Sequence, residues 1–135
     1  VVCGRRTTGH AFGHIDLRVA SIAAALPFYE ALLPELGFTH RFHGPVWKAW
    51  AAELELPAAA YLAITESPGH RPGESRIAFW TESAAEVDRL AAVATDAGAR
   101  DVSGPKPMPY SPGYYAVFFA DPSGNLLEIY HRPPA

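Results

Sequence analysis

The segment Asp121–His131 reads DPSGNLLEIYH, a cluster of turn-forming residues followed by an apolar strand that carries a carboxylate, Glu128. A second segment near the start, Gly13–Val19, reads GHIDLRV and alternates apolar with polar residues, as a half-buried strand does. It begins with an imidazole, His14. An ionisable group inside an apolar strand needs a reason, because an unpaired buried charge is costly. We therefore take His14 and Glu128 as candidates for one site.

The chain carries a weak internal repeat. HIDLRVAS, which begins at His14, aligns with RIAFWTES, which begins at Arg76, 62 residues on (76 − 14). YLAI aligns with LLEI and sets Ala63 against Glu128, 65 residues on (128 − 63). Each repeat reads as a strand, a helix and three strands. The sequence therefore predicts an α+β fold of two paired βαβββ modules that form a concave mixed sheet with helices outside.

The signals for the two helices are local. Ser21 can cap a helix that includes ALPFYEALLPELGF, where Pro27 fits only in the first turn and Gly37 favours the end. Ser83 and Glu86 form a capping box before AAEVDRLAAVATDAG. Strands are predicted for the runs FTHRFH, VWKAWAAE, AAAYLAIT, RIAFWT, ARDVSG, YYAVFFA and NLLEIYH.

The length of 135 residues suits one domain. We expect residues 1–12 to be a disordered or extended tail and residues 13–135 to be a single domain. Its modules span 13–67 and 74–132, on either side of the breaker SPGHRPGES.

Composition limits the partners. A net charge of −3 argues against nucleic acid as a partner, since phosphate binding needs a concentrated basic surface. No apolar run approaches the roughly 20 residues of a membrane span, so no membrane partner is expected. Cys3 is the single cysteine and fits a reducing cytoplasm. We therefore expect a cytoplasmic protein that binds neither nucleic acid nor a membrane.

GHIDLRV, PFYEALLPELGF, RIAFWTES and YYAVFFADPSGNLLEIYH together resemble the vicinal oxygen chelate superfamily. This superfamily includes glyoxalase I, the fosfomycin and bleomycin resistance proteins, and extradiol dioxygenases. The resemblance covers residues 14–131. It implies paired βαβββ modules, assembled as a homodimer, with one divalent metal (Zn, Ni, Fe or Mn) commonly bound.

The resemblance places the metal-ligand positions at His14, Ala63, Arg76 and Glu128. Only His14 and Glu128 can donate, because alanine offers no ligand and arginine has no lone pair to give. The metal set is therefore incomplete, and a bound metal would be weak or absent unless other donors rebuild the site. The candidates for such donors are Asp16, Thr65, Glu66, His40, His43 and His131.

Arg76 replaces a family ligand with a fixed positive charge. We expect its guanidinium to face Glu128, to fill the volume of the lost metal and to keep this carboxylate ionised. In a metal-free enzyme, Glu128 would then be the base and Arg76 the oxyanion partner. The structural alternative is an exposed arginine at the end of a strand.

Aromatic residues are the second signal, because several of them fall on the inferred concave face. An apolar cup with a few polar groups is typical of a small-molecule pocket. The loop SGPKPMPYSPGYY is long enough to form a lid that presents Met108 and Tyr110. The predicted ligand-binding residues are Trp80, Tyr61, Trp50, Tyr110 and Tyr130.

Three functions remain open. The first is binding or sequestration of a small molecule in an aromatic cup. The second is a metal-dependent glyoxalase-like lyase or isomerase, or an extradiol-type dioxygenase, acting on a substrate with vicinal oxygens. The third is the metal-free enzyme that uses Glu128 and Arg76.

Overall fold

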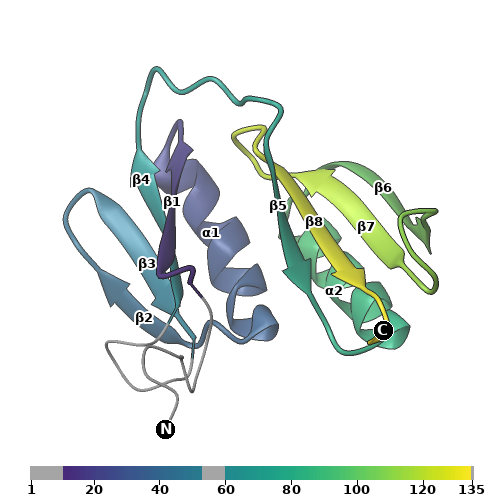
Figure 1. Ribbon diagram of the computed structural model, residues 1–135. Coiled ribbons are helices and arrows are strands. Elements are labelled where there is room, and N and C mark those ends of the chain that lie inside the picture. The colour runs from purple at the N-terminus through teal and green to yellow at the C-terminus, as the bar shows by residue number, and fades with distance from the viewer. Residues whose placement is uncertain (1–10, 53–59, 135) are drawn as a thin grey trace, which may run out of the picture.

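The computed structural model describes residues 11–52 and 60–134 (Figure 1). The predicted tail therefore lies almost entirely outside the described residues, as does Cys3. The first module contains β1 (His14–Val19), α1 (Ile22–Leu32), the 3-10 turn η1 (Pro34–Leu36), β2 (His40–His43), β3 (Trp47–Ala51) and β4 (Tyr61–Glu66). The second contains β5 (Arg76–Trp80), α2 (Ala84–Ala97), β6 (Arg100–Pro107), β7 (Tyr115–Ala120) and β8 (Leu126–His131).

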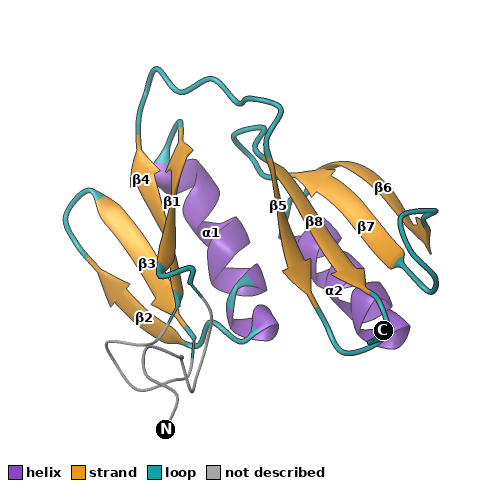
Figure 2. Ribbon diagram, viewed as in Figure 1, coloured by secondary structure: helices purple, strands orange, loops and turns teal. Residues whose placement is uncertain are grey.

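The strands form two four-stranded mixed sheets with the same topology. Sheet A has the order β1-β4-β3-β2, and sheet B has the order β5-β8-β7-β6. The first and last strands of each module pair in parallel, and the other neighbours are antiparallel. The two sheets lie side by side with β1 and β5 as their facing edges, and the helices cover one side of them (Figure 2). The α+β fold of paired βαβββ modules is confirmed.

The strand register reproduces the repeat seen in the sequence. His14 pairs with Tyr61 in sheet A, and Arg76 pairs with Leu126 in sheet B. Two residues further along, Asp16 is opposite Ala63, while Ala78 is opposite Glu128. Residues that the sequence repeat aligns, 62 positions apart in the first strands and 65 in the last, thus have equivalent places in the two sheets. Ala63 and Glu128 therefore occupy matching positions on the two sheets.

Both helices begin where a serine caps them. Ser21 Oγ accepts a hydrogen bond from the backbone N–H of Ala24, and Ser83 Oγ accepts one from that of Glu86. The Ser21 cap starts α1 at Ile22, so the expectation that Pro27 lies in the first turn is wrong. Pro27 lies inside the helix, where its missing N–H leaves the carbonyl of Ala23 without its helical partner.

Proline also ends α1 earlier than predicted. The helix ends at Leu32 with Leu33 as its C-cap, and Pro34 then opens the short turn η1. Gly37 ends that turn at φ +94°, a left-handed conformation that glycine adopts without strain. Among the described residues, no helix is long and apolar enough to cross a membrane.

The core lies between the helices and one face of each sheet. Phe28 of α1 packs against Phe119 of β7 at a ring-centroid distance of 6.3 Å, so a single core joins both modules. Alternation along the strands sends every second side chain to this core. The sheet residues buried in it include Val19, Leu62, Ile64, Val117, Phe119, Leu127 and Ile129. The opposite face of each sheet, here called its open face, carries the ionisable groups.

The turn between β7 and β8 binds the two modules together. Ser123 Oγ accepts a hydrogen bond from the backbone N–H of Ala20, and Asn125 Nδ2 donates to the carbonyl oxygen of Arg18. Asn125 Oδ1 lies 2.8 Å from Nε2 of His70, in the connection between the modules. The sequence DPSGN is thus both a turn and the contact that fixes one module on the other.

Candidate functional site

The open face of sheet B carries the carboxylate. Glu128 lies at the middle of this face, opposite Ala78 of β5 and Phe118 of β7. Its exposed fraction is only 6%, although it is on the open face. The side chains of the loop before β7 therefore cover it.

Tyr114 holds the Glu128 carboxylate. Its hydroxyl donates a short hydrogen bond to Glu128 Oε2. Its ring stacks on the ring of Tyr130, with the ring centroids 4.9 Å apart and an interplanar angle of 4°. The Tyr110 ring contacts the Tyr114 ring edge-on, with the ring centroids 5.0 Å apart. A backbone hydrogen bond from Met108 N to the Tyr114 carbonyl closes the loop. Burial and the hydrogen bond to Glu128 raise the pKa of Tyr114, so its hydroxyl stays a donor.

Sequence reasoning missed Tyr114. The run GYYAVFF contains two adjacent tyrosines, and alternation alone could not assign their faces. In the structure, Tyr115 points to the helix side and donates to Asp88 of α2 at 2.7 Å. Two phenols adjacent in sequence thus bind carboxylates on opposite sides of the sheet.

Arg76 does not pair with Glu128. Its Nη1 donates to the carbonyl oxygen of Leu127 at 3.0 Å, and its guanidinium carbon lies 5.0 Å from the centroid of the Phe118 ring. The expected ion pair is therefore wrong, because the side chain extends across the sheet instead of turning to the neighbouring carboxylate. Arg76 is exposed and belongs to the same open face.

The open face of sheet A carries the imidazole. The His14 ring stacks on the Tyr61 ring, with the ring centroids 4.5 Å apart and an interplanar angle of 2°. Asp16 accepts hydrogen bonds from Thr65 at 2.7 Å and from Arg18 at 3.1 Å. A cleft of about 210 Å³ is lined by His14, Asp16, Tyr61 and Thr65, together with Phe42, Trp47 and Ala63. Asp16 is thus near His14 as expected, but its oxygens already have partners.

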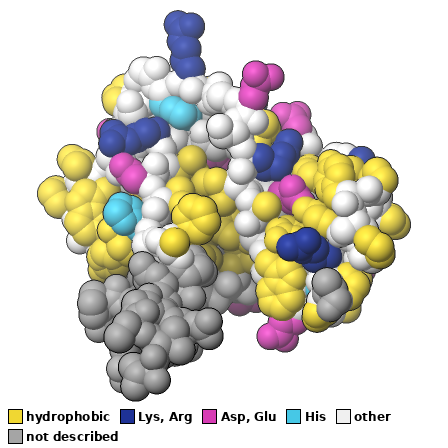
Figure 3. Space-filling view, viewed as in Figure 1, with side chains coloured by type: hydrophobic (Ala, Val, Ile, Leu, Met, Phe, Trp, Pro, Cys, Tyr) yellow, Lys and Arg dark blue, Asp and Glu magenta, His cyan; other side chains and the backbone are white. Residues whose placement is uncertain are grey.

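A groove of about 440 Å³ runs between β1 and β5. His14 and Tyr61 line it on one side, and Arg76 and Ala78 line it on the other. Hydrophobic side chains gather along this line between the two sheets (Figure 3). The structure therefore brings His14 and Arg76 to one groove, whereas Glu128 lines a different part of sheet B.

These residues do not fit a complete metal site. Of the four family positions, Ala63 and Arg76 offer no donor, and the two that do, His14 and Glu128, lie on different sheets. The part of the chain that the structure describes contains no cluster of three or more His, Cys, Asp or Glu side chains able to hold a metal ion. His131, a candidate replacement donor, faces away and lies 2.8 Å from the carbonyl oxygen of Thr81.

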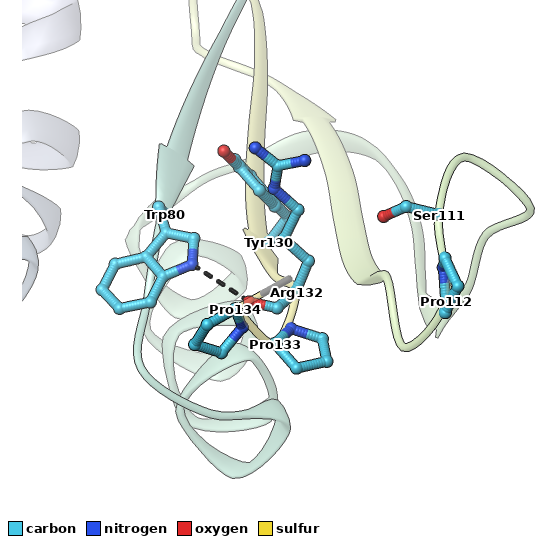
Figure 4. A pocket seen from close by; sticks show the side chains of 7 residues that line it. All are labelled: Trp80, Ser111, Pro112, Tyr130, Arg132, Pro133 and Pro134. Carbon is cyan, nitrogen blue, oxygen red and sulfur yellow. Dashed lines mark hydrogen bonds between the residues drawn. The ribbon is translucent and has the colours of Figure 1, made fainter.

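Two of the predicted aromatic residues meet in a cleft of about 700 Å³ at the end of sheet B (Figure 4). Trp80 is 53% exposed, and its indole Nε1 donates to the carbonyl oxygen of Arg132 at 3.5 Å. Tyr130 and Arg132 lie next to each other, beside Trp80 (Figure 4). The cleft, called the Trp80 cleft below, is lined by Trp80, Ser111, Pro112, Tyr130, Arg132, Pro133 and Pro134.

Trp50 is not on an open face. It is 1% exposed and points into the core, where its ring lies 6.4 Å from that of Tyr29. Its prediction as a ligand-binding residue is therefore wrong. Tyr61 lies on the open face of sheet A, and Tyr110 is 60% exposed at the rim of sheet B.

Known proteins share this architecture. A glyoxalase/bleomycin resistance protein from Albidiferax ferrireducens T118 is 24% identical, with a TM-score of 0.71, over 92% of this chain and 100% of that chain. The fosfomycin resistance protein FosX from Mesorhizobium loti is 16% identical, with a TM-score of 0.65, over 93% of this chain and 95% of that one. FosX from Listeria monocytogenes, complexed with Mn(II) and sulfate ion, is 17% identical, with a TM-score of 0.67, over 93% of both chains.

The comparison with curated protein sequences gives no match. The family comparison is decisive, because the model of the Glyoxalase/Bleomycin resistance protein/Dioxygenase superfamily matches residues 11–129. That range includes His14, Glu128 with the turn before it, and all of both sheets except the last two residues of β8. The chain belongs to the Glyoxalase/Bleomycin resistance protein/Dioxygenase superfamily.

Proposed function

We propose that this protein binds a small organic molecule against the open faces of its sheets. The observation that carries the proposal is the Trp80 cleft, where an indole ring that is 53% exposed lies beside Tyr130. Large aromatic side chains are usually buried, and a half-exposed one beside a hollow favours stacking with a flat ligand. A cytoplasmic site of action fits the single cysteine of the chain.

We also propose that the protein acts as a homodimer. β1 and β5 each pair with one strand, so each leaves one edge of its backbone without a strand neighbour among the described residues. His14 and Glu128 lie on the open faces of different sheets. A second copy that brings its sheet B against sheet A would enclose both groups in one cup, which supports this assembly.

The second candidate is an enzyme of the same superfamily. Glu128 favours it, because a carboxylate on an open face can act as a base once Tyr114 moves aside. The Mn(II) complex of the Listeria protein makes a divalent metal a candidate cofactor here too. Since the donors of this chain do not fit a complete site, we derive no step through a metal. The metal-free form would use Glu128 as base and the guanidinium of Arg76 to stabilise an oxyanion.

The test is binding of the neutral aromatic probes indole and benzamide, followed by amide chemical shifts in NMR spectra. We expect both probes to shift residues around Trp80 and Tyr130. Trp80→Ala should weaken binding by at least about tenfold, because stacking on a large ring is lost. Val46→Ser is the control, since Val46 is 60% exposed and lies outside the cleft. Absence of binding, or equal affinity in Trp80→Ala, contradicts the proposal.

A further inference from the structure

A second cleft, of about 450 Å³, lies on the open face of sheet B. Its floor includes Phe118, on the inner strand β7. Arg76 and Lys106 line it from β5 and β6, which are the two edge strands of this sheet. Two cationic side chains thus reach the same hollow from opposite edges.

The contacts show how the two charges converge. The Arg76 guanidinium carbon lies 5.0 Å from the centroid of the Phe118 ring. Lys106 Nζ donates to Ser103 Oγ at 2.8 Å, and Ser103 is the strand-register partner of Phe118. Both charges are therefore held near one aromatic ring.

Within the described ranges, neither cation forms an ion pair with a carboxylate. Among the described residues, Arg76 and Lys106 have no carboxylate oxygen within 4.0 Å, the distance of an ion pair. Asp101 also lines the cleft, so the lining carries two positive charges and one negative. Glu128 lies beside Phe118, and its carboxylate is bonded to Tyr114. A guanidinium has five N–H donors and an ammonium three, so donors remain for a ligand.

We propose that this cleft binds the carboxylate of a small organic acid, whose apolar part lies against Phe118 and Met108. Arg76 binds the carboxylate through charge-assisted hydrogen bonds, and Lys106 adds the second charge. Arg76 stands at a family metal-ligand position, so the same position would bind the ligand directly instead of through a metal. This cleft is separate from the Trp80 cleft, so the inference, which rests on the proposed small-molecule function, adds a second site and names the chemical class of the ligand there.

The experiment compares benzoate with benzamide, which has nearly the same shape and no charge. Dissociation constants are measured by NMR titration of the full chain, at low salt and at high salt. The variants are Arg76→Gln and Lys106→Gln. Arg100→Gln is the matched control, because Arg100 is also on β6 and donates to the Pro122 carbonyl outside the cleft. Thermal melts verify that each variant folds.

We expect benzoate to shift residues around Phe118 and to bind at least about tenfold more tightly than benzamide there, because a charge-assisted hydrogen bond is lost in the amide. Arg76→Gln and Lys106→Gln should each weaken benzoate binding, Arg100→Gln should not, and salt should weaken it. Equal affinity for both probes, or no loss in either variant, overturns the inference and leaves the proposed function in place. Failure of benzoate, benzamide and indole alike overturns both.

Discussion

The Tyr29 hydroxyl donates a hydrogen bond of 2.6 Å to Asp121 Oδ2, and both residues are fully buried. Tyr29 belongs to α1 of the first module, whereas Asp121 begins the β7–β8 turn of the second. The Asp121 carboxylate also accepts hydrogen bonds from the backbone N–H groups of Ser123 and Asn125 and from Asn125 Nδ2. The buried charge is therefore fully hydrogen-bonded, and it joins α1 of the first module to the β7–β8 turn of the second.

The first prediction concerns this contact. Tyr29→Phe should lower the free energy of unfolding by about 1.5–3 kcal/mol, because a buried carboxylate loses one of its donors. Urea unfolding followed by circular dichroism measures the change. Tyr115→Phe is the control, since that phenol bonds to a carboxylate at the surface, and its loss should be smaller. An equal loss in the two variants would contradict a special role of Tyr29.

The second prediction is a dependence of stability on alkaline pH. Burial raises the pKa of Tyr29 well above its ordinary value of 10.0, and the negative charge of Asp121 and its hydrogen bond with Tyr29 raise it further. In the unfolded chain this phenol ionises near pH 10, whereas in the folded protein it stays protonated. Its contribution is therefore fully present below pH 10 and is lost as pH rises from there towards the folded pKa.

Unfolding free energies measured between pH 8 and pH 11 check this prediction. The wild type should lose stability above pH 10 more steeply than Tyr29→Phe does. Tyr114→Phe serves for comparison, because the raised pKa of Tyr114 adds a slope of the same sign. Parallel curves for the wild type and Tyr29→Phe would show that Tyr29 does not titrate in this way.

The repeat and most strands could be predicted because their signals are local. Alternation identified β1 to within a residue, and the two serine caps identified the helix starts. The prediction of a long lid is wrong for the first residues of the loop SGPKPMPYSPGYY, because β6 continues through Pro107. Proline has no N–H to donate, but β6 is an edge strand and tolerates this loss.

The parts of the candidate site that could not be predicted depend on contacts between elements. Trp50 lies in a run where Ala49 and Ala51 are buried as well, so alternation could not indicate its face. The direction of Arg76 depends on the Phe118 ring, two strands away in the sheet. The partner of Glu128 depends on how the loop before β7 folds. Where apolar and polar residues alternate clearly, the strand pattern identifies the face of a residue, but the hydrogen-bond partners on that face come from tertiary packing.

The third prediction separates the two tryptophans. Trp50→Ala should lower the free energy of unfolding by about 3–5 kcal/mol, because it empties a large volume in the core. Trp80→Ala should change stability much less, since Trp80 is 53% exposed, yet it should abolish most aromatic-probe binding. Urea unfolding and the indole titration give the two readouts. Loss of probe binding in a folded Trp50→Phe variant, with Trp80→Ala unaffected, would reverse these roles.

The last prediction concerns metal binding. His14 and Glu128 are the only donors at the four family positions, and Oε2 of Glu128 already accepts a hydrogen bond from the Tyr114 hydroxyl. We therefore expect metal content well below one equivalent in the purified protein. Titrations with Mn(II), Fe(II), Ni(II) and Zn(II) should give only weak binding, and Glu128→Ala should leave it almost unchanged. Glu74→Ala is the control, because Glu74 is an exposed acid between the modules. Stoichiometric metal that disappears in Glu128→Ala but not in Glu74→Ala would show that other donors, including those of a second copy, complete the site. The enzyme function would then become the leading candidate.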